Sequence, residues 1–181
     1  VGVYYGKISF VVWFYEPPGG MGALIGADDM PLPYEYYGAI TKGLFIAPNG
    51  YLEYGDWFGW CGVNEEYASS SAPVSPGWHM AVVTESINNS GGTIMLYLDG
   101  NLVGTYSYYS PGCGAPTLAW GGSSFGLPAY WYIGGNNLAG YINNVQAFYF
   151  NGTIAYVAIY NTVLNSTQVQ ELYQAGFPNT L

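Results

Sequence analysis

The chain has 181 residues, of which 50% are hydrophobic and 19% aromatic. This excludes a disordered protein and predicts one domain with a sizeable core. Only 7% of the residues are charged, with two lysines and no arginine against 11 acids and a net charge of −9. Nucleic acids and anionic lipids are bound through clustered cations, so the composition excludes both as partners.

Strand-forming residues dominate the first third of the chain. The run Lys7–Tyr15 is rich in β-branched and aromatic residues, and it ends before Pro17 because proline cannot donate to a β-ladder. Only residues 1–6 precede this run, so they form either a short strand or leave an open position in one sheet. Further strands are expected at residues 22–27, 44–47 and 51–54.

Three stretches are expected to be irregular: residues 28–41, 56–77 and 110–127. Loops this long in a compact domain are usually functional or tied down. The only two cysteines, Cys61 and Cys113, lie in the second and third stretches. In an oxidising compartment they form one disulfide, which closes a loop of about 50 residues and stabilises the fold by about 3–4 kcal/mol. Two separate free thiols are the alternative, and neither cysteine has metal-ligand spacing.

Residues 78–109 predict a β-meander around which the rest of the chain is organised. Two strand-forming runs, Met80–Thr84 and Thr93–Leu98, flank a turn-rich segment, and Asp99-Gly100 then reverses the chain again. Asp99 therefore has a mainly structural role in this turn. Both faces of Thr93–Leu98 are apolar, which is typical of a strand inside a sandwich.

The C-terminal part predicts strands followed by one short helix. The helix is expected at Ser166–Ala175, where Val169, Leu172 and Tyr173 form one apolar face. Asn165 suits the N-cap, and Gly176 suits the C-terminal cap. The strands are expected at residues 129–133, 145–150 and 153–160.

Three stretches, in order, resemble laminin-G-like domains of the concanavalin A-like jelly-roll superfamily. The run Trp78-His79-Met80-Ala81-Val82-Val83, followed by Leu96-Tyr97-Leu98-Asp99-Gly100, resembles the central hairpin of that family. Tyr132-Ile133-Gly134-Gly135 and then Phe150–Asn161, leading into the helix, agree with it. The resemblance implies a single domain over residues 1–181, an all-β antiparallel two-sheet sandwich with one short C-terminal helix. The family includes lectins, adhesion modules, pentraxins and glycosidases, so the ligand stays open.

Catalytic patterns are weak in this sequence. His79 is the only histidine, and the resemblance gives it a structural role at the start of a strand. Glycosidases of the superfamily carry Glu-x-Asp-x-x-Glu on one strand, because the two carboxyl groups must flank the sugar. Glu53 and Asp56 supply two acids without the third, and the adjacent acids Glu65 and Glu66 would point in opposite directions. We therefore expect no enzyme activity, and a secreted glycosidase ranks third among the functions considered.

Candidate ligand sites rest on acids and aromatic residues in the expected loops. No cofactor is required, but calcium is a hypothesis because many relatives bind it through loop oxygens, and solvated acids are the alternative. The calcium candidates are Asp28, Asp29, Asp56 and Glu65. Aromatic residues beside polar groups suit either a glycan or a protein interface, whereas core packing is the alternative, favoured for Trp60 on a disulfide. The contact candidates are Tyr34, Tyr36, Tyr37, Trp57, Trp60, Tyr108 and Tyr109.

Several features favour an extracellular or cell-surface protein. Asn88, Asn151 and Asn165 begin Asn-x-Ser/Thr sequons, the acceptors of N-linked glycans. No run of 18 apolar residues is present, and Val1 in place of a Met favours a processed or trimmed start.

Two functions lead on this basis. The first is a non-enzymatic structural or adhesive subunit of a cell-surface or filamentous assembly, which self-associates through β-edges and aromatic loops. Residues 1–6 would then be donated to a neighbour and complete its sheet beside the last strand. The second is a lectin-like carbohydrate-binding module of a secreted protein. An adhesive assembly that also binds glycans is consistent with both.

Overall fold

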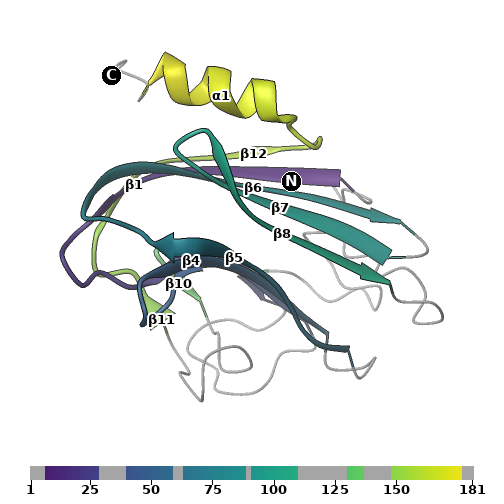
Figure 1. Cartoon of the computed structure of the whole chain (residues 1–181). Coiled ribbons are helices and arrows are strands. Elements are labelled where there is room, and N and C mark those ends of the chain that lie inside the picture. Colours follow the sequence, from purple (N-terminus) through teal and green to yellow (C-terminus); the bar gives the residue numbers. More distant parts are fainter. Residues whose placement is uncertain are drawn as a thin grey trace.

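The structure is a computed structural model that describes residues 7–28, 40–58, 63–88, 91–109, 130–136 and 148–176. Two β-sheets lie face to face, and one helix lies on the outer side of one of them (Figure 1). This confirms the expected β-sandwich with a short C-terminal helix. No helix in these described ranges is long and apolar enough to cross a membrane.

The first sheet has five strands in the order β12-β1-β6-β7-β8, and every neighbouring pair is antiparallel. The central meander predicted from the sequence forms three of its strands, and the N-terminal run lies between the meander and the last strand. The bounds are β1 (Lys7–Glu16), β6 (Gly77–Asn88), β7 (Gly91–Leu98), β8 (Asn101–Tyr109) and β12 (Thr153–Tyr160).

The second sheet has seven strands, in the order β10-β11-β2-β3-β4-β5 with β9 paired to β2. Its pairs are antiparallel except for a single parallel contact between Tyr149 and Ala23, which joins β11 to β2. The bounds are β2 (Gly22–Asp28), β3 (Ile40–Ile46), β4 (Tyr51–Phe58), β5 (Val63–Pro73), β9 (Tyr130–Ile133), β10 (Gly135–Asn136) and β11 (Phe148–Tyr149).

The prediction of an irregular stretch at residues 56–77 is wrong over most of that range. Residues 56–58 continue β4, and Val63–Pro73 forms β5, which pairs with β4 through two register shifts. The Ser-rich segment at residues 69–71 is part of this strand. A polar edge strand with bulges lacks the apolar alternation that reveals strands in a sequence. Residues 110–127 lie outside the described residues.

The main core fills the space between the two sheets. Phe10, Val12 and Phe14 of β1 face Leu24, Leu44 and Tyr54 of the second sheet, and all are fully buried. A second core lies between the outer face of the first sheet and the helix α1 (Ser166–Ala175). There Val11, Met80, Val82 and Tyr97 contact Leu164 and Val169. Because β1 has a core on each face, its side chains are buried without alternation.

The ends of α1 agree with the prediction. The Asn165 side chain accepts a hydrogen bond from the Gln168 backbone N–H, and the Gln168 side chain accepts one from the Asn165 N–H. This reciprocal capping box satisfies two backbone groups that a helix start leaves open. Ser9 fixes the preceding turn to β1, since its Oγ donates to the Thr162 carbonyl and accepts from the Leu164 N–H.

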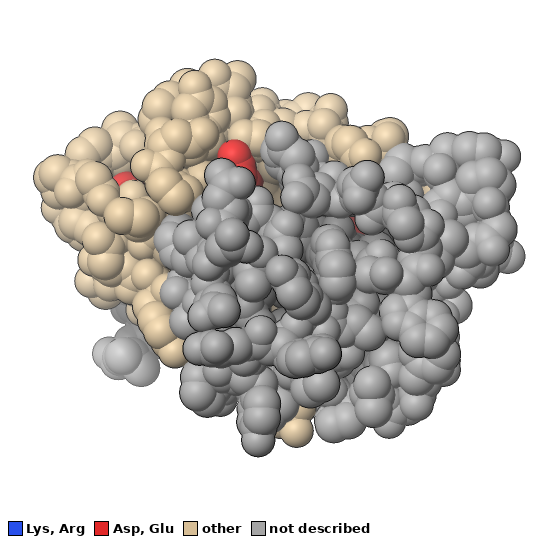
Figure 2. Space-filling view, turned by 90° about the horizontal axis from the view of Figure 1, so that it is seen from below, with Lys and Arg blue, Asp and Glu red and all other residues tan. Residues whose placement is uncertain are grey.

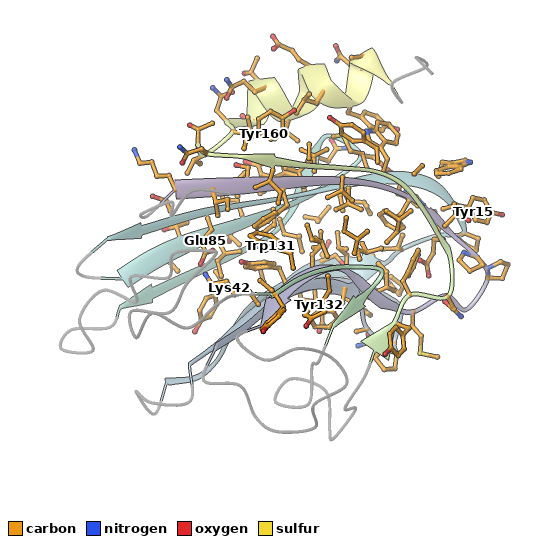
Figure 3. The ribbon with its side chains drawn as sticks, turned by 180° about the vertical axis from the view of Figure 1, so that it is seen from behind. Tyr15, Lys42, Glu85, Trp131, Tyr132 and Tyr160 are labelled. Carbon is orange, nitrogen blue, oxygen red and sulfur yellow. The ribbon has the colours of Figure 1, made fainter. Side chains whose placement is uncertain are left out.

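A buried ion pair links the two sheets. Lys42 Nζ of β3 lies 2.9 Å from both carboxylate oxygens of Glu85 in β6, and the Tyr54 hydroxyl donates to the same carboxylate at 3.1 Å. Figure 3 shows Lys42 and Glu85 reaching toward each other across the sandwich. One of the two lysines of the chain is therefore buried, and the other, Lys7, is exposed. Where Figure 2 shows described residues, the surface is mostly uncharged, with small acidic patches.

Candidate adhesive surface

The strand β12 lies at one edge of the first sheet. It pairs with β1 from Ser9–Tyr160 to Trp13–Tyr156, and a register shift follows toward its start. Among the described residues, no strand pairs with its other side. Its sequence, TIAYVAIY, contains neither a charged residue nor proline. Sheet edges that avoid pairing with other chains usually carry such residues, so β12 is suited to accept a further strand.

The opposite edge of the same sheet, strand β8, is obstructed by the second sheet. There β8 lies against β5 of the second sheet. A Cβ atom at Gly104 of β8 would collide with the backbone carbonyl of Ser69 in β5, so only glycine permits this approach. The two edges of the sheet therefore differ: packing against β5 obstructs β8, whereas β12 has β1 as its only strand partner within the described residues.

An aromatic surface lies beside β12, where α1 no longer covers the sheet. We call it the aromatic shelf and define it by four residues on the outer side of the first sheet. Tyr15 lies clear of α1, whereas Tyr160 lies below the helix (Figure 3). The shelf residues and their exposed fractions are Tyr15 (38%), Trp78 (53%), Tyr156 (37%) and Tyr173 (39%).

Ring contacts hold the shelf together. Tyr15 and Trp78 are cross-strand partners, with ring centroids 5.7 Å apart and planes at 65°. Tyr173 of α1 stacks on the buried Trp13 at 5.9 Å and 13°, and Trp13 is in turn the cross-strand partner of Tyr156. Such contacts contribute about 0.5–1.5 kcal/mol each beyond area burial and limit ring motion. The shelf is thus a preformed apolar surface.

A charged cluster supports the shelf from the inner side of the sheet. His79 follows Trp78, and its Nδ1 and Nε2 lie 2.7 Å from Asp99 Oδ2 and the Ser75 carbonyl oxygen. Both partners are hydrogen-bond acceptors, so the two contacts favour the protonated ring, in which both nitrogens donate. The hydrogen bond to Asp99 raises the pKa of His79, with further support from Ser75, while burial opposes it. This arrangement confirms the structural role of His79.

Asp99 fixes the turn between β7 and β8. Its Oδ1 accepts a hydrogen bond from the Met80 N–H at 2.9 Å, and its own N–H donates to the Met80 carbonyl. Asp99 has a φ of 51°, a left-handed conformation that aspartate tolerates better than most residues. The predicted structural role of Asp99 is therefore confirmed.

The calcium candidates do not all lie in loops, which corrects the expectation. Asp28 ends β2, Asp56 lies in β4 and Glu65 lies in β5. The strand β3 runs between Asp28 and Asp56, since Asp28 pairs with Thr41 and Asp56 pairs with Lys42. Their side chains and all of Asp29 lie outside the described residues. Among the side chains that are described, no three His, Cys, Asp or Glu residues gather as a metal site.

The other predicted site residues are only partly covered. Asn151 and Asn165 are exposed, and Asn88 ends β6. Trp57 lies in β4, and Tyr108 and Tyr109 lie in β8, but their side chains are outside the described part. The Cys61–Cys113 disulfide therefore stays a prediction, as do ligand or interface contacts of the segment at residues 34–37. The predicted site residues that lie wholly outside the described ranges, besides Asp29, are Tyr34, Tyr36, Tyr37, Trp60, Cys61 and Cys113.

Sequence reasoning missed the aromatic shelf. Strand alternation places Tyr15, Trp78 and Tyr156 on the outer face, and Tyr173 belongs to the predicted helix. The sequence does not show where α1 ends on that face, and this position decides which aromatic side chains are covered. The proline after β1 was the available signal, because it places Tyr15 at the sheet's end.

Comparisons with known proteins agree on the fold. Residues 43–170 match the family model of the concanavalin A-like lectin/glucanases superfamily. No curated protein sequence matches the chain.

Among solved structures, the sialyllactose-bound CBM40 of the Ruminococcus gnavus IT-sialidase is similar, with a TM-score of 0.62 and 14% identity over 94% of this chain and 84% of that one. The heptameric SAP-like pentraxin of Limulus polyphemus has a TM-score of 0.59 and 12% identity over 98% and 74%. Domains LG4-5 of the mouse laminin α1 chain have a TM-score of 0.55 and 14% identity over 91% and 42%. At these identities the likeness shows the fold alone.

Proposed function

The chain belongs to the concanavalin A-like lectin/glucanase superfamily, and from this premise we propose that it is an extracellular, non-enzymatic adhesive subunit of a cell-surface or filamentous assembly. The observation that carries the proposal is the uncharged strand β12, which among the described residues pairs with β1 alone. A neighbour's strand would add its backbone hydrogen bonds along this edge. The pentraxin of similar fold is heptameric, which is consistent with self-association of such a sandwich.

Residues 1–6 are the proposed donor segment. Their sequence, VGVYYG, is β-prone and uncharged, so it matches the character of β12. Strand donation needs no charge complementarity, since the backbone supplies the hydrogen bonds and alternate side chains supply the specificity. Such a link suits a chain whose surface offers few ion pairs.

A non-enzymatic role is supported by the state of His79. Both of its ring nitrogens are engaged, one by the Asp99 carboxylate and the other by the Ser75 carbonyl, so neither is directed at a nucleophile. Its partner Asp99 also accepts a hydrogen bond from the Met80 backbone. These residues therefore hold the hairpin in place.

A charged substitution at the edge tests the proposal. Ile159 of β12 is partly exposed, and Ile159→Lys places a charge where a neighbour's strand would pair. We expect this variant to lose most of the assembly of the wild-type protein in light scattering, with an unchanged circular dichroism spectrum. Leu102→Lys is the matched control, because Leu102 is also an exposed apolar strand residue but lies in β8. Equal assembly of both variants would argue against β12 as the joining edge.

The second candidate function is a carbohydrate-binding module. The specific observation in its favour is the aromatic shelf, since flat aromatic faces bind the apolar faces of sugars. The similar CBM40 was solved with sialyllactose bound. A neutral-glycan array would test it: saturable binding that Trp78→Ala abolishes supports the module, and an array without hits rejects it.

Further properties belong to the same proposal. We take Asn88, Asn151 and Asn165 as glycosylation sites and Cys61–Cys113 as a disulfide, as expected of an extracellular protein. Calcium at Asp28, Asp29, Asp56 or Glu65 would be seen as a calcium-dependent rise in melting temperature. Intact-mass analysis before and after reduction measures both the N-linked glycans and the disulfide.

A further inference from the structure

We propose that the aromatic shelf is the seat of an N-linked glycan carried by Asn151 of the same chain, with an uncharged sugar ring stacked in the corner between Trp78 and Tyr15. The proposal rests on the extracellular, glycosylated character proposed above. It assigns a ligand to the shelf, and it names the chain's own glycan as that ligand.

The sequon Asn151-Gly152-Thr153 lies directly beside the shelf. Thr153 is the cross-strand partner of Tyr15. Gly152 approaches the same residue so closely that a Cβ atom there would collide with the Tyr15 carbonyl oxygen. Asn151 is two residues, or about 7 Å of extended chain, from the row that contains Thr153, Tyr15 and Trp78, and β6 lies two strand spacings, about 10 Å, to the side of β12. The first sugars of an N-linked glycan span these distances.

The Asn151 side chain is held in a position that suits modification. Its Oδ1 accepts a hydrogen bond from the Met21 N–H at 2.8 Å, and its own N–H donates to the Met21 carbonyl at 3.1 Å. Glycosylation attaches the sugar at Nδ2 and leaves Oδ1 as an acceptor, so the bond to Met21 persists. Asn151, Gly152 and Thr153 are all exposed. The attachment point is thus fixed and accessible.

The shape and charge of the shelf select an uncharged sugar. The Trp78 and Tyr15 rings meet at 65°, so they form a corner with one aromatic face and one ring edge. None of the four shelf residues carries a charge. His79, which follows Trp78, is paired with Asp99 at 2.7 Å, and Glu16, which follows Tyr15, is buried. A sugar ring presents an apolar face to the indole and hydroxyl groups to water, which matches this environment.

The sequon at Asn165 provides an internal control. Asn165 caps the start of α1, whereas Tyr173 lies in its last turn. Eight residues of helix separate them by about 12 Å. A glycan on Asn165 therefore begins at the far end of the helix and is not expected to cover the Trp78–Tyr15 corner.

The test is oxidative footprinting of the natively isolated glycoprotein, read by mass spectrometry for the peptides that contain Tyr15 and Trp78. Two sequon variants, made in the same cells, remove one glycan each and keep the shape of the side chain: Thr153→Val and Thr167→Val. We expect Thr153→Val to raise the oxidation of Trp78 several-fold and that of Tyr15 in parallel. Thr167→Val should leave both unchanged. Enzymatic removal of all N-glycans should reproduce the Thr153→Val result.

Three results would overturn the proposal. One is an unmodified Asn151 in the native protein, and another is equal oxidation of Trp78 with and without the Asn151 glycan. The third is an increase that Thr167→Val produces equally. The readout is made on protein whose circular dichroism matches wild type, so misfolding does not mimic exposure. Light scattering on the same samples reports assembly separately, so loss of glycan seating is distinguished from failure of the proposed self-association.

Discussion

His79 and Asp99 show how single residues position a surface. The imidazolium bonds the turn carboxylate and the Ser75 carbonyl, so the start of β6 and the turn after β7 are held together. Trp78 precedes this histidine, and the shelf depends on that placement. The sequence predicted structural roles for both residues, but the bond between them joins positions 20 residues apart, which no local pattern reveals.

The stability of the protein is expected to fall above neutral pH because of His79. Its pKa is raised in the folded state, so its contribution is complete below the ordinary value of 6.5 and is lost as the pH rises through the folded value. The facing groups are Asp99, Glu16, the Ser75 carbonyl and the Phe14 ring. Melting temperatures measured between about pH 6 and 9 should fall for wild type and fall less for His79→Gln. Parallel curves for the two proteins would contradict this assignment.

Glu16 is a second group whose titration contributes to the pH dependence of stability. Burial raises the pKa of its carboxyl, which His79 partly offsets. The contribution of Glu16 is therefore present below 4.5 and is lost as the pH rises through its raised value.

Removing the buried lysine is expected to be costly. Lys42→Met leaves Glu85 as a buried carboxylate without its cation, and breaking such a pair typically costs about 3–5 kcal/mol. Urea unfolding measures the loss. Combining Lys42→Met with Glu85→Leu and Tyr54→Phe removes the three polar side chains that bond one another and should recover most of the stability. If the triple variant were no more stable than the single one, lost packing would explain the cost better than the uncompensated charge.

At the scale of elements, most strands follow from the sequence but β5 does not. The apolar runs that form β1, β6 and β7 are recognised by their β-branched and aromatic residues, and Asn165 marks the helix start. β5 is polar, bulged and Ser-rich, and it forms because β4 offers a partner edge. Strands that depend on a partner carry little signal of their own. The Lys42–Glu85 contact was missed for a similar reason, since it joins two sheets.

The close approach of β8 to β5 is expected to depend on Gly104. Gly104→Ala would drive a methyl group into the Ser69 carbonyl, which must shift or separate the two strands. Overpacking of this kind costs about 1–3 kcal/mol. Chemical denaturation measures the change, and Ala155→Gly, at an exposed strand position in β12, provides a comparison for glycine–alanine propensity. A neutral Gly104→Ala would show that β5 and β8 adapt freely.

The helix cap is expected to contribute on its own. Asn165→Ala removes the acceptor for the Gln168 N–H and should lower stability by about 1 kcal/mol. Asn165→Asp retains the acceptor, and it removes the sequon as well. Thermal unfolding of the two variants separates capping from glycosylation, because an equal loss in both would implicate the missing glycan.

At the scale of the whole molecule, the resemblance predicted the sandwich, and the structure adds which edge and which face are uncovered. The sequence indicated too few charges to guard its edges, but both β8 and β12 are uncharged, so charge alone does not distinguish them. The difference arises from β5, which obstructs β8. The candidate site on β12 and the shelf is therefore a property of the assembled sandwich.

The assembly state of the natively isolated protein is the first measurement to make, because it shows whether β12 joins neighbouring subunits. Size-exclusion chromatography with light scattering measures the mass of the particles, and negative-stain microscopy shows their form. We expect oligomers or filaments, and we expect deletion of residues 1–6 to convert them to monomers that retain the wild-type circular dichroism spectrum. A monodisperse monomer at high concentration would contradict the claim that β12 joins neighbouring subunits.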